Sequence, residues 1–307
     1  MRLAGLEAWR DGPTKSAILD FVGRVTTDGP DFVAPEERVA VFDNDGTLWV
    51  EKPTLVQLDF LVRRLAELAA ADPGLCDRQP YAAAAAGDLA WFDDVMVRHY
   101  NGDDSGLEEL AGGLFSAYQG LTVEDHAARV GAFFDAAVHP TLNRPYTACG
   151  YTPMVQLLSY LQSQGFSNYI VSGGGRDFMR PVTTGMYGIP PERVIGSSTG
   201  LDFADGHLLT TSRPEFLNDG PAKAVRIWGR TGRRPILAAG NSNGDIEMLE
   251  FTAAAPGPSL SMLVRHDDAQ REFDYTTGAE RAFAVAAERG WPVASIRDEW
   301  ATVFQAP

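Results

Sequence analysis

The sequence predicts an α/β fold with a doubly wound, mostly parallel, Rossmann-like sheet and an inserted all-helical domain. Short valine- and isoleucine-rich runs alternate with helical patterns over most of the chain, as expected for a parallel sheet. This alternation stops after the first run, where an alanine- and leucine-rich block repeats apolar residues at helical spacing. We therefore expect a core domain of residues 1–50 and 148–307 and a helical domain of residues 51–147.

The first predicted elements are a helix over residues 14–25 and a buried strand in the run RVAVFD, residues 38–43. The run is compact and rich in valine, and it ends in polar residues, which is typical of a strand covered on both faces. The block that follows has four segments with helical periodicity and no convincing strand. Thr122 is expected to cap the last of these helices.

After a proline-rich linker at residues 139–147, strands and helices alternate again. Gly165 is expected to end an amphipathic helix, and Asp205-Gly206 is expected at the turn of a hairpin. The charged run RHDDAQREFDY, residues 265–275, is interpreted as a solvated edge at the end of a strand, and the alternative is that it borders the site. The remaining strands are expected in the runs SNYIVSGGG, ERVIGSS, PILAAG, SLSMLVRHD and WPVASI.

The composition and net charge of the chain indicate which classes of molecule it is expected to bind. The chain has 307 residues, of which 45% are hydrophobic, and a formal net charge of -15. An acidic surface repels nucleic acids and anionic membranes, so neither is expected as a partner. The isolated Cys76 and Cys149, together with apolar runs too short for a signal peptide or a membrane span, predict a cytoplasmic protein with reduced thiols.

Three loops that follow predicted strands carry unusual polar residues. They are DNDGT at residues 43–47, SGGGRD at residues 172–177 and GNSNGD at residues 240–245. Lys223 begins a helix between the second and the third of these loops. Because ligands bind beyond the carboxyl ends of the strands in an open parallel sheet, we expect these residues to gather at one site.

Asp43 and Asp45 stand one residue apart where the first strand ends. A hard cation would offset the repulsion between these carboxylates and an anionic substrate, and a carboxylate with a backbone carbonyl is ordinary ligation for Mg²⁺. The alternative is a plain turn of asparagine, aspartate and glycine at the end of a strand. For Lys223 the alternative is an ordinary lysine on a helix surface.

The four features together resemble the motifs of the haloacid dehalogenase superfamily. DNDGT resembles its first motif, D-x-D-x-T, and Ser172 at the end of a strand resembles its second. Lys223 resembles the third motif, and GNSNGD resembles the fourth. The SGG run, the glycine-centred last loop and the helical insert, which is similar to a mobile cap domain, look most like the phosphoserine phosphatase branch.

The resemblance implies phosphoryl transfer through a covalent intermediate. Asp43 would be the nucleophile that forms an aspartyl-phosphate, and Asp45 would be the general acid and base. Lys223 would pair with Asp43 and with the transferring phosphoryl group. Dehalogenases have no leaving alcohol to protonate and lack the second aspartate, so Asp45 favours phosphoryl transfer over cleavage of a carbon–halogen bond.

The resemblance also implies which residues bind phosphate and metal. Thr47 would shape the catalytic loop, and Ser172 with the backbone of Gly173 and Gly174 would hold phosphate oxygens. The implied Mg²⁺ ligands are Asp43, Asp45, Asn241 and Asp245. One position departs from the pattern, because the phosphoserine phosphatase branch has Gly-Asp where this chain has Gly240-Asn241. Either Asn241 is a neutral ligand or Asp245 makes the direct contact.

Two residues beside the motifs are candidates for binding the rest of the substrate. Glu51 would suit an amino group, and Arg176 would suit a second anionic group. The alternatives are a solvated hinge for Glu51 and a helix-capping or interdomain salt bridge for Arg176.

These observations predict a Mg²⁺-dependent phosphatase that acts on a small phosphorylated metabolite. A phosphotransferase or phosphomutase with the same covalent intermediate is one alternative. A catalytically silent binding protein of the same fold is the other, because Asn241 brings no charge to the fourth motif. No motif identifies the leaving group or the oligomeric state.

Overall fold

A computed structural model describes residues 5–100, 103 and 105–305. Within these residues, seven strands form one sheet in the order β4-β3-β2-β1-β5-β6-β7. Neighbouring strands run parallel except for β3 and β4, which pair antiparallel, so the predicted mostly parallel sheet is confirmed. The strands are β1 (Val39–Phe42), β2 (Ser167–Gly175), β3 (Val194–Ala204), β4 (His207–Phe216), β5 (Leu237–Gly240), β6 (Leu260–Arg265) and β7 (Val293–Ser295).

The chain divides into two compact units. The first comprises Met1–Lys52, Phe134–Ser197 and Leu217–Pro307, and the second comprises Pro53–Phe133 and Ser198–Phe216. The second unit therefore differs from the predicted helical domain, because it includes a hairpin from the later part of the chain. The boundaries of a separate cap domain at residues 51 and 147 stay a prediction.

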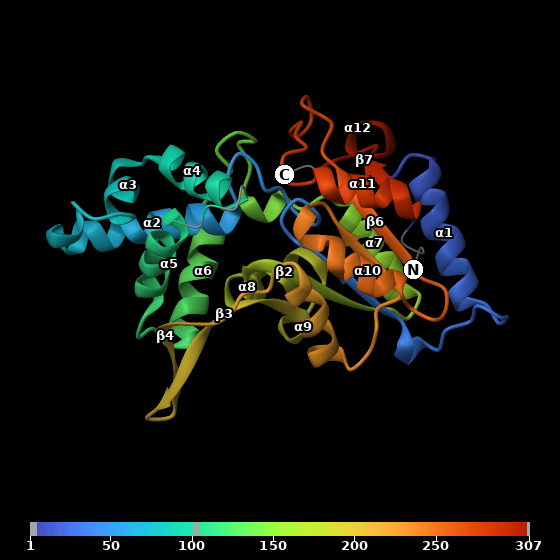
Figure 1. Ribbon diagram of the computed structural model, residues 1–307, viewed down its shortest axis with the longest axis horizontal. Coiled ribbons are helices and arrows are strands. Elements are labelled where there is room, and N and C mark those ends of the chain that lie inside the picture. Colours follow the sequence, from blue (N-terminus) through green and yellow to red (C-terminus); the bar gives the residue numbers. More distant parts are fainter. Residues whose placement is uncertain (1–4, 101–102, 104, 306–307) are drawn as a thin grey trace. The chain divides into compact units, whose positions relative to one another are not determined.

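Helices cover both faces of the sheet in the first unit. Val39 and Val41 of β1 lie in one buried cluster with side chains from three of these helices, α9, α10 and α11, which lie on one face (Figure 1). The alternate residues of this strand, Ala40 and Phe42, point to the other face of the sheet. They are also fully buried, so that face is covered too. The helices of this unit are α1 (Pro13–Thr26), α7 (Thr152–Ser163), α8 (Arg176–Tyr187), α9 (Pro221–Thr231), α10 (Ile246–Ala253), α11 (Glu280–Arg289) and α12 (Ile296–Glu299).

The second unit has an apolar core of its own. Leu65, Phe92 and Leu110, from three different helices, belong to one buried cluster. Thr122 caps the last helix as predicted, because its Oγ1 accepts the backbone N–H of Asp125 at 3.0 Å. The helices are α2 (Val56–Ala71), α3 (Tyr81–Ala86), α4 (Leu89–Tyr100), α5 (Ser105–Tyr118) and α6 (Val123–Ala136), the last of which continues into the first unit. Nowhere in the described residues does a helix combine the length and the apolar character needed to cross a bilayer.

The hairpin of β3 and β4 belongs to the second unit because of its hydrogen bonds. The backbone N–H of Thr210 donates to Leu121 O, and Thr210 O accepts the N–H of Gly120, both at 2.8 Å. The predicted turn is present, and Asp205 and Gly206 have φ values of 50° and 85°. The turn is thus a local feature, whereas the place of the hairpin depends on a pairing between segments distant in sequence.

Candidate active site

The predicted functional residues gather because parallel strands end at one edge of the sheet. β1 pairs in parallel with both β2 and β5, so the loops after these three strands lie next to each other. Asp43 follows β1 directly, Ser172 lies near the end of β2, and Asn241 follows β5. Lys223 reaches the same edge from the first turn of α9.

A buried lysine lies between two buried carboxylates. Lys223 Nζ is 2.7 Å from Asp43 Oδ1 and 2.5 Å from Asp245 Oδ1. Burial alone would lower the pKa of Lys223, but the charges of Asp245 and Asp43 raise it, so the lysine stays protonated. Burial and the charge of Asp245 hold the pKa of Asp43 well above its usual range, even against the effect of Lys223. The cluster thus has one cation for two acids.

Asp245 is held in place by its own loop. Its Oδ2 accepts the backbone N–H groups of Asn241 and Ser242 at 3.0 Å and the Ser242 hydroxyl at 3.1 Å. The carboxylate lies so close over Gly240 that a Cβ there would be 2.5 Å from Asp245 Cγ. Both oxygens of Asp245 are thus engaged within the protein, and its role as a metal ligand stays a prediction.

Asp45 is oriented by a residue outside the motifs. Trp49 Nε1 donates to Asp45 Oδ1 at 2.8 Å, and Ser172 Oγ lies 3.5 Å from Asp45 Oδ2. Burial raises the pKa of Asp45 to about 6, against the hydrogen bond from Trp49 and with help from the charge of Glu51. A carboxyl group with a pKa in this range can donate a proton in one step and accept one in the next.

The turn after β1 is closed by backbone hydrogen bonds. The carbonyl oxygen of Asn44 accepts N–H groups from the following residues, and the N–H of Gly46 donates to Trp49 O at 2.8 Å. Gly46 has a φ of 74°, a left-handed conformation that glycine adopts without strain. A Cβ at this position would lie 2.1 Å from Asn241 Nδ2 and 2.7 Å from Glu51 Oε1. The turn therefore requires glycine for both its conformation and its space.

Gly46→Ala is expected to lower the free energy of unfolding by about 2–4 kcal/mol, because left-handed strain adds to overpacking. Gly232→Ala is the matched control: Gly232 also has a positive φ, 63°, but nothing lies within 4 Å of the added Cβ. The control should cost only about 1–2 kcal/mol. Urea denaturation of both variants measures the difference, and equal losses would contradict the crowding at Gly46.

The end of β2 is fixed by two residues that sequence reasoning missed. Asn218 is fully buried, and its Nδ2 donates to Ser172 O at 2.9 Å. Ser197 Oγ donates to Gly173 O at 2.7 Å, and the N–H of Gly174 donates to Ser172 Oγ at 3.0 Å. The only signal for Asn218 is its position just before the third motif, and Ser197 has none.

Glu51 is engaged within the protein. Its Oε1 accepts Asn241 Nδ2 at 3.0 Å and the Tyr275 hydroxyl at 2.6 Å. Asn241 Oδ1 in turn accepts the Thr47 hydroxyl at 3.1 Å. These bonds fix which way the amide of Asn241 faces, and they give Glu51 a role that the sequence did not indicate. A contact between Glu51 and the substrate stays a prediction.

Arg176 also has a protein partner. Its Nε and Nη2 lie 3.2 and 2.9 Å from the two carboxylate oxygens of Asp177, and Arg180 Nη1 contacts the same group at 2.8 Å. This geometry is a salt bridge within α8, so it is neither the helix cap nor the interdomain contact of the alternative interpretation. The contact of Arg176 with a second anionic group of the substrate stays a prediction.

The oxygen atoms at this edge suit a hard cation that keeps part of its hydration shell. Among the described residues, no group of three or more histidine, cysteine, aspartate or glutamate side chains forms a metal site. Asp43 has a second carboxylate oxygen, Asp45 has a backbone carbonyl, and Asn241 has an amide oxygen. One carboxylate with neutral oxygens fits Mg²⁺, which usually binds one or two carboxylates, waters and a substrate phosphate.

The fold and this site define an α/β protein in which one edge of the sheet carries a buried aspartate–lysine pair. The family model of the haloacid dehalogenase-like hydrolases matches residues 40–250, a segment that contains all four motifs. The chain therefore belongs to the haloacid dehalogenase-like hydrolases, and the resemblance inferred from its motifs is confirmed.

The chain is similar to solved structures at low sequence identity, and the first of the two named here shares its fold. A conserved functionally unknown protein from Anaerococcus prevotii DSM 20548 is 16% identical, with 98% of each chain covered and a TM-score of 0.60. A phosphoserine phosphohydrolase-like protein from Francisella tularensis subsp. tularensis SCHU S4 is 16% identical over 84% of this chain and 94% of that chain, with a TM-score of 0.46. No curated protein matches the sequence.

Proposed function

We propose that this hydrolase is a Mg²⁺-dependent phosphatase that cleaves a small-molecule phosphomonoester through an aspartyl-phosphate on Asp43. The observation that carries the proposal is the buried Lys223, whose Nζ lies 2.7 Å from Asp43 Oδ1. A cation at this distance offsets the repulsion between the attacking carboxylate and an anionic phosphoryl group.

Two steps complete the reaction. First, a carboxylate oxygen of Asp43 forms a bond to phosphorus while the bond from phosphorus to the leaving oxygen breaks. Asp45 gives its proton to the leaving oxygen, so that an alcohol departs. Asp45 then takes a proton from water as the water oxygen attacks phosphorus, and the bond to Asp43 breaks to release inorganic phosphate. Ser172 and Lys223 hold phosphoryl oxygens through both steps.

Asp45→Asn is expected to separate the two steps. p-Nitrophenyl phosphate has a leaving group that departs without a proton, so Asp43 is still phosphorylated, but the intermediate persists because no base activates water. Rapid mixing should show a burst of about one nitrophenolate per enzyme, followed by turnover at least about 100-fold below the wild-type rate. An alkyl phosphate should give neither phase. Wild-type turnover without a burst would remove Asp45 from the mechanism.

A metal ion is proposed because Lys223 does not balance the two acids beside it. Asp43, the backbone carbonyl of Asp45 and the amide oxygen of Asn241 would hold Mg²⁺, which would polarise a phosphoryl oxygen as a Lewis acid. Asp245 is bonded to Lys223 and to its own loop. Of the two interpretations of the fourth motif, we therefore favour Asn241 as the direct ligand.

Chelation of divalent cations with EDTA is expected to lower turnover at least about 100-fold, and added Mg²⁺ should restore it. The measurement is phosphate release before chelation, after chelation and after restoration. The wild-type chain with Mg²⁺ never removed is the control. Turnover that persists after complete chelation would contradict a role for the metal.

A screen of phosphorylated metabolites, scored by the inorganic phosphate released, tests the function itself. Acceptor alcohols are added in parallel, because a phosphotransferase or mutase would form a new phosphoester in place of phosphate. If no compound releases phosphate and no phosphoenzyme forms, the catalytically silent binding protein becomes the better interpretation.

The proposed partner is a small phosphorylated metabolite in the cytoplasm. The net charge of -15 opposes binding to nucleic acids and anionic membranes. Cys76 and Cys149 are both free thiols, which fits a reducing compartment.

A further inference from the structure

The loop that follows β6 is part of the catalytic edge. Residues 265–275 were interpreted from the sequence as a solvated edge, and this interpretation is wrong for three of their charged or titratable side chains. His266, Asp268 and Glu272 are only 2%, 6% and 5% exposed. A buried charge requires partners inside the protein, so each of these side chains indicates a specific contact.

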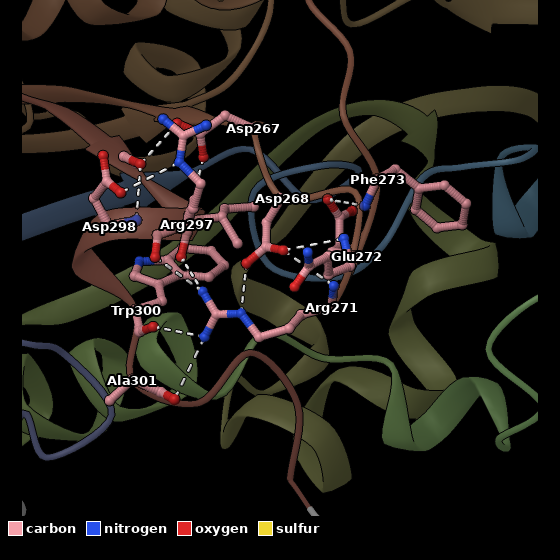
Figure 2. A network of polar contacts seen from close by, with 12 residues as sticks. Asp267, Asp268, Arg271, Glu272, Phe273, Arg297, Asp298, Trp300 and Ala301 are labelled. Carbon is pink, nitrogen blue, oxygen red and sulfur yellow. Dashed lines mark hydrogen bonds and ion pairs between the residues drawn. The ribbon is translucent and has the colours of Figure 1, made fainter.

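Arg271 anchors the side of this loop that faces the C-terminal segment. Figure 2 shows its guanidinium group between the carboxylate of Asp268 and the backbone carbonyls of Trp300 and Ala301. The bond to Trp300 O is 2.8 Å long. These contacts fix the loop to the C-terminal segment, and they do not involve the catalytic residues.

Glu272 accepts the hydrogen bonds on the side of the loop that faces the residues after β1. Its Oε1 accepts the Tyr151 hydroxyl at 2.7 Å, and its Oε2 accepts the N–H of Phe273 at 2.8 Å. His266 Nδ1 lies 3.1 Å from the same Oε2. Glu272 thus accepts hydrogen bonds at both of its oxygens.

His266 connects this carboxylate to the catalytic loop. Its Nε2 lies 2.8 Å from Gly46 O, while its Nδ1 faces Glu272. Because a backbone carbonyl can only accept, Nε2 carries the proton of the hydrogen bond to Gly46 O. Burial lowers the pKa of His266, but the hydrogen bond and the charge of Glu272 outweigh burial and raise it. The ring of Tyr275 stacks on the ring of His266 at a centroid distance of 4.4 Å.

We propose that His266 is a positioning residue, which holds the carbonyl of Gly46 and so keeps Asp45 in its catalytic orientation. Gly46 is bonded on its other side as well, because its N–H donates to Trp49 O. The indole of Trp49 then donates to Asp45 Oδ1. The two peptide groups of Gly46 are thus both held, and the carboxyl group of Asp45 is linked to them through Trp49. The kinetic consequence rests on the proposed function, whereas the structural consequence does not.

Two matched substitutions test the proposal. His266→Gln can place an amide donor near the position of Nε2 and keep the bond to Gly46. His266→Asn can reach only as far as Nδ1, so it keeps the bond to Glu272 and loses Gly46. We expect His266→Asn to lower kcat about 10- to 100-fold with little change in KM, and His266→Gln to restore most of that loss. If the two variants had equal kcat, or if the order were reversed, the positioning role would be overturned.

A spectroscopic experiment tests the contacts of His266 without depending on turnover. Nitrogen-15 NMR of the wild-type chain should show His266 Nε2 protonated, and the indole N–H signal of Trp49 should move in His266→Asn but not in His266→Gln. A His266 ring without a proton at Nε2, or a Trp49 signal that is unchanged in both variants, would overturn the proposal even if the chain were active. If the wild type released no phosphate from any monoester, the proposed function would fail while this experiment still decided the role of His266.

Arg271→Gln is the control for a merely structural effect. It removes the anchor of the same loop to the C-terminal segment without touching His266 or Gly46. We expect a lower melting temperature with an unchanged kcat and an unchanged Trp49 indole signal. If Arg271→Gln reproduced the kinetic loss of His266→Asn, the loss would come from general loosening of the loop, and the specific role of His266 would be wrong.

Discussion

Asp43→Asn is expected to abolish turnover, with a fall of at least about 10⁴-fold in phosphate release. An amide oxygen is a poor nucleophile, so no bond to phosphorus forms and the covalent intermediate does not appear. Intact-protein mass spectrometry after mixing with a substrate should find no added phosphoryl group on the variant. Wild-type turnover in this variant would show that another group attacks phosphorus.

The same variant is expected to stay folded and, in EDTA, to melt at the same temperature as the wild type or higher. In the wild type, Lys223 faces two buried carboxylates, at Asp43 and Asp245. In the variant it faces one carboxylate and one amide, which removes the excess negative charge and keeps an acceptor for Nζ. Asp20→Asn on the exposed face of α1 is the control for the substitution itself. A large fall in melting temperature in Asp43→Asn alone would contradict this charge balance.

The fold was predictable because its elements carry local signals. β1 is a run of four buried residues, and its valines predict a strand that is covered on both faces. The hairpin turn at Asp205-Gly206 was equally visible. The assignment of the hairpin to the second unit was not, because it depends on the bonds that Thr210 makes with Gly120 and Leu121. Pairing between segments distant in sequence leaves no periodic pattern in either of them.

A site residue could be predicted when two conditions were met. It had to belong to a recognisable motif, and it had to follow the end of a predicted strand. Asp43 and Asp45 met both conditions and Lys223 met the first, and the structure brings the three to one edge. Asn218 met neither condition, and His266 follows a strand but belongs to no motif. A buried asparagine that holds a carbonyl and a buried histidine between two acceptors look, in a sequence, like the polar residues of any loop. Their contacts become visible only when the strands have been placed side by side.

The charge balance of the site follows from where its acids are bonded. Asp245 is engaged by Lys223 and by backbone N–H groups, so it behaves as part of the scaffold. Asn241 occupies the position where the family pattern has a further acid, and Glu51 lies 3.0 Å from its amide nitrogen. A carboxylate at position 241 would face Glu51 directly and would repel it. The neutral residue at this position is therefore consistent with its surroundings in this chain.

Lys223→Met is expected to lower the free energy of unfolding by about 3–5 kcal/mol, because it leaves two buried acids without a cation. Methionine is similar in length, so the loss reports charge more than volume. Lys15→Met removes an ion pair with the exposed Asp11, 2.9 Å away, and should cost less than about 1 kcal/mol. Urea denaturation compares the two variants. Equal, small losses would mean that Lys223 is not what holds the cluster together.

The double substitution Lys223→Met with Asp245→Asn separates stability from catalysis. Removing the second acid relieves the repulsion, and the new amide can turn its nitrogen toward Asp43, so most of the lost stability should return. Turnover should stay at least about 10³-fold below the wild type, because no cation faces the transferring phosphoryl group. Recovery of both properties would show that Lys223 serves only to neutralise Asp245. Recovery of stability alone is the result expected if the lysine acts on the reacting phosphate.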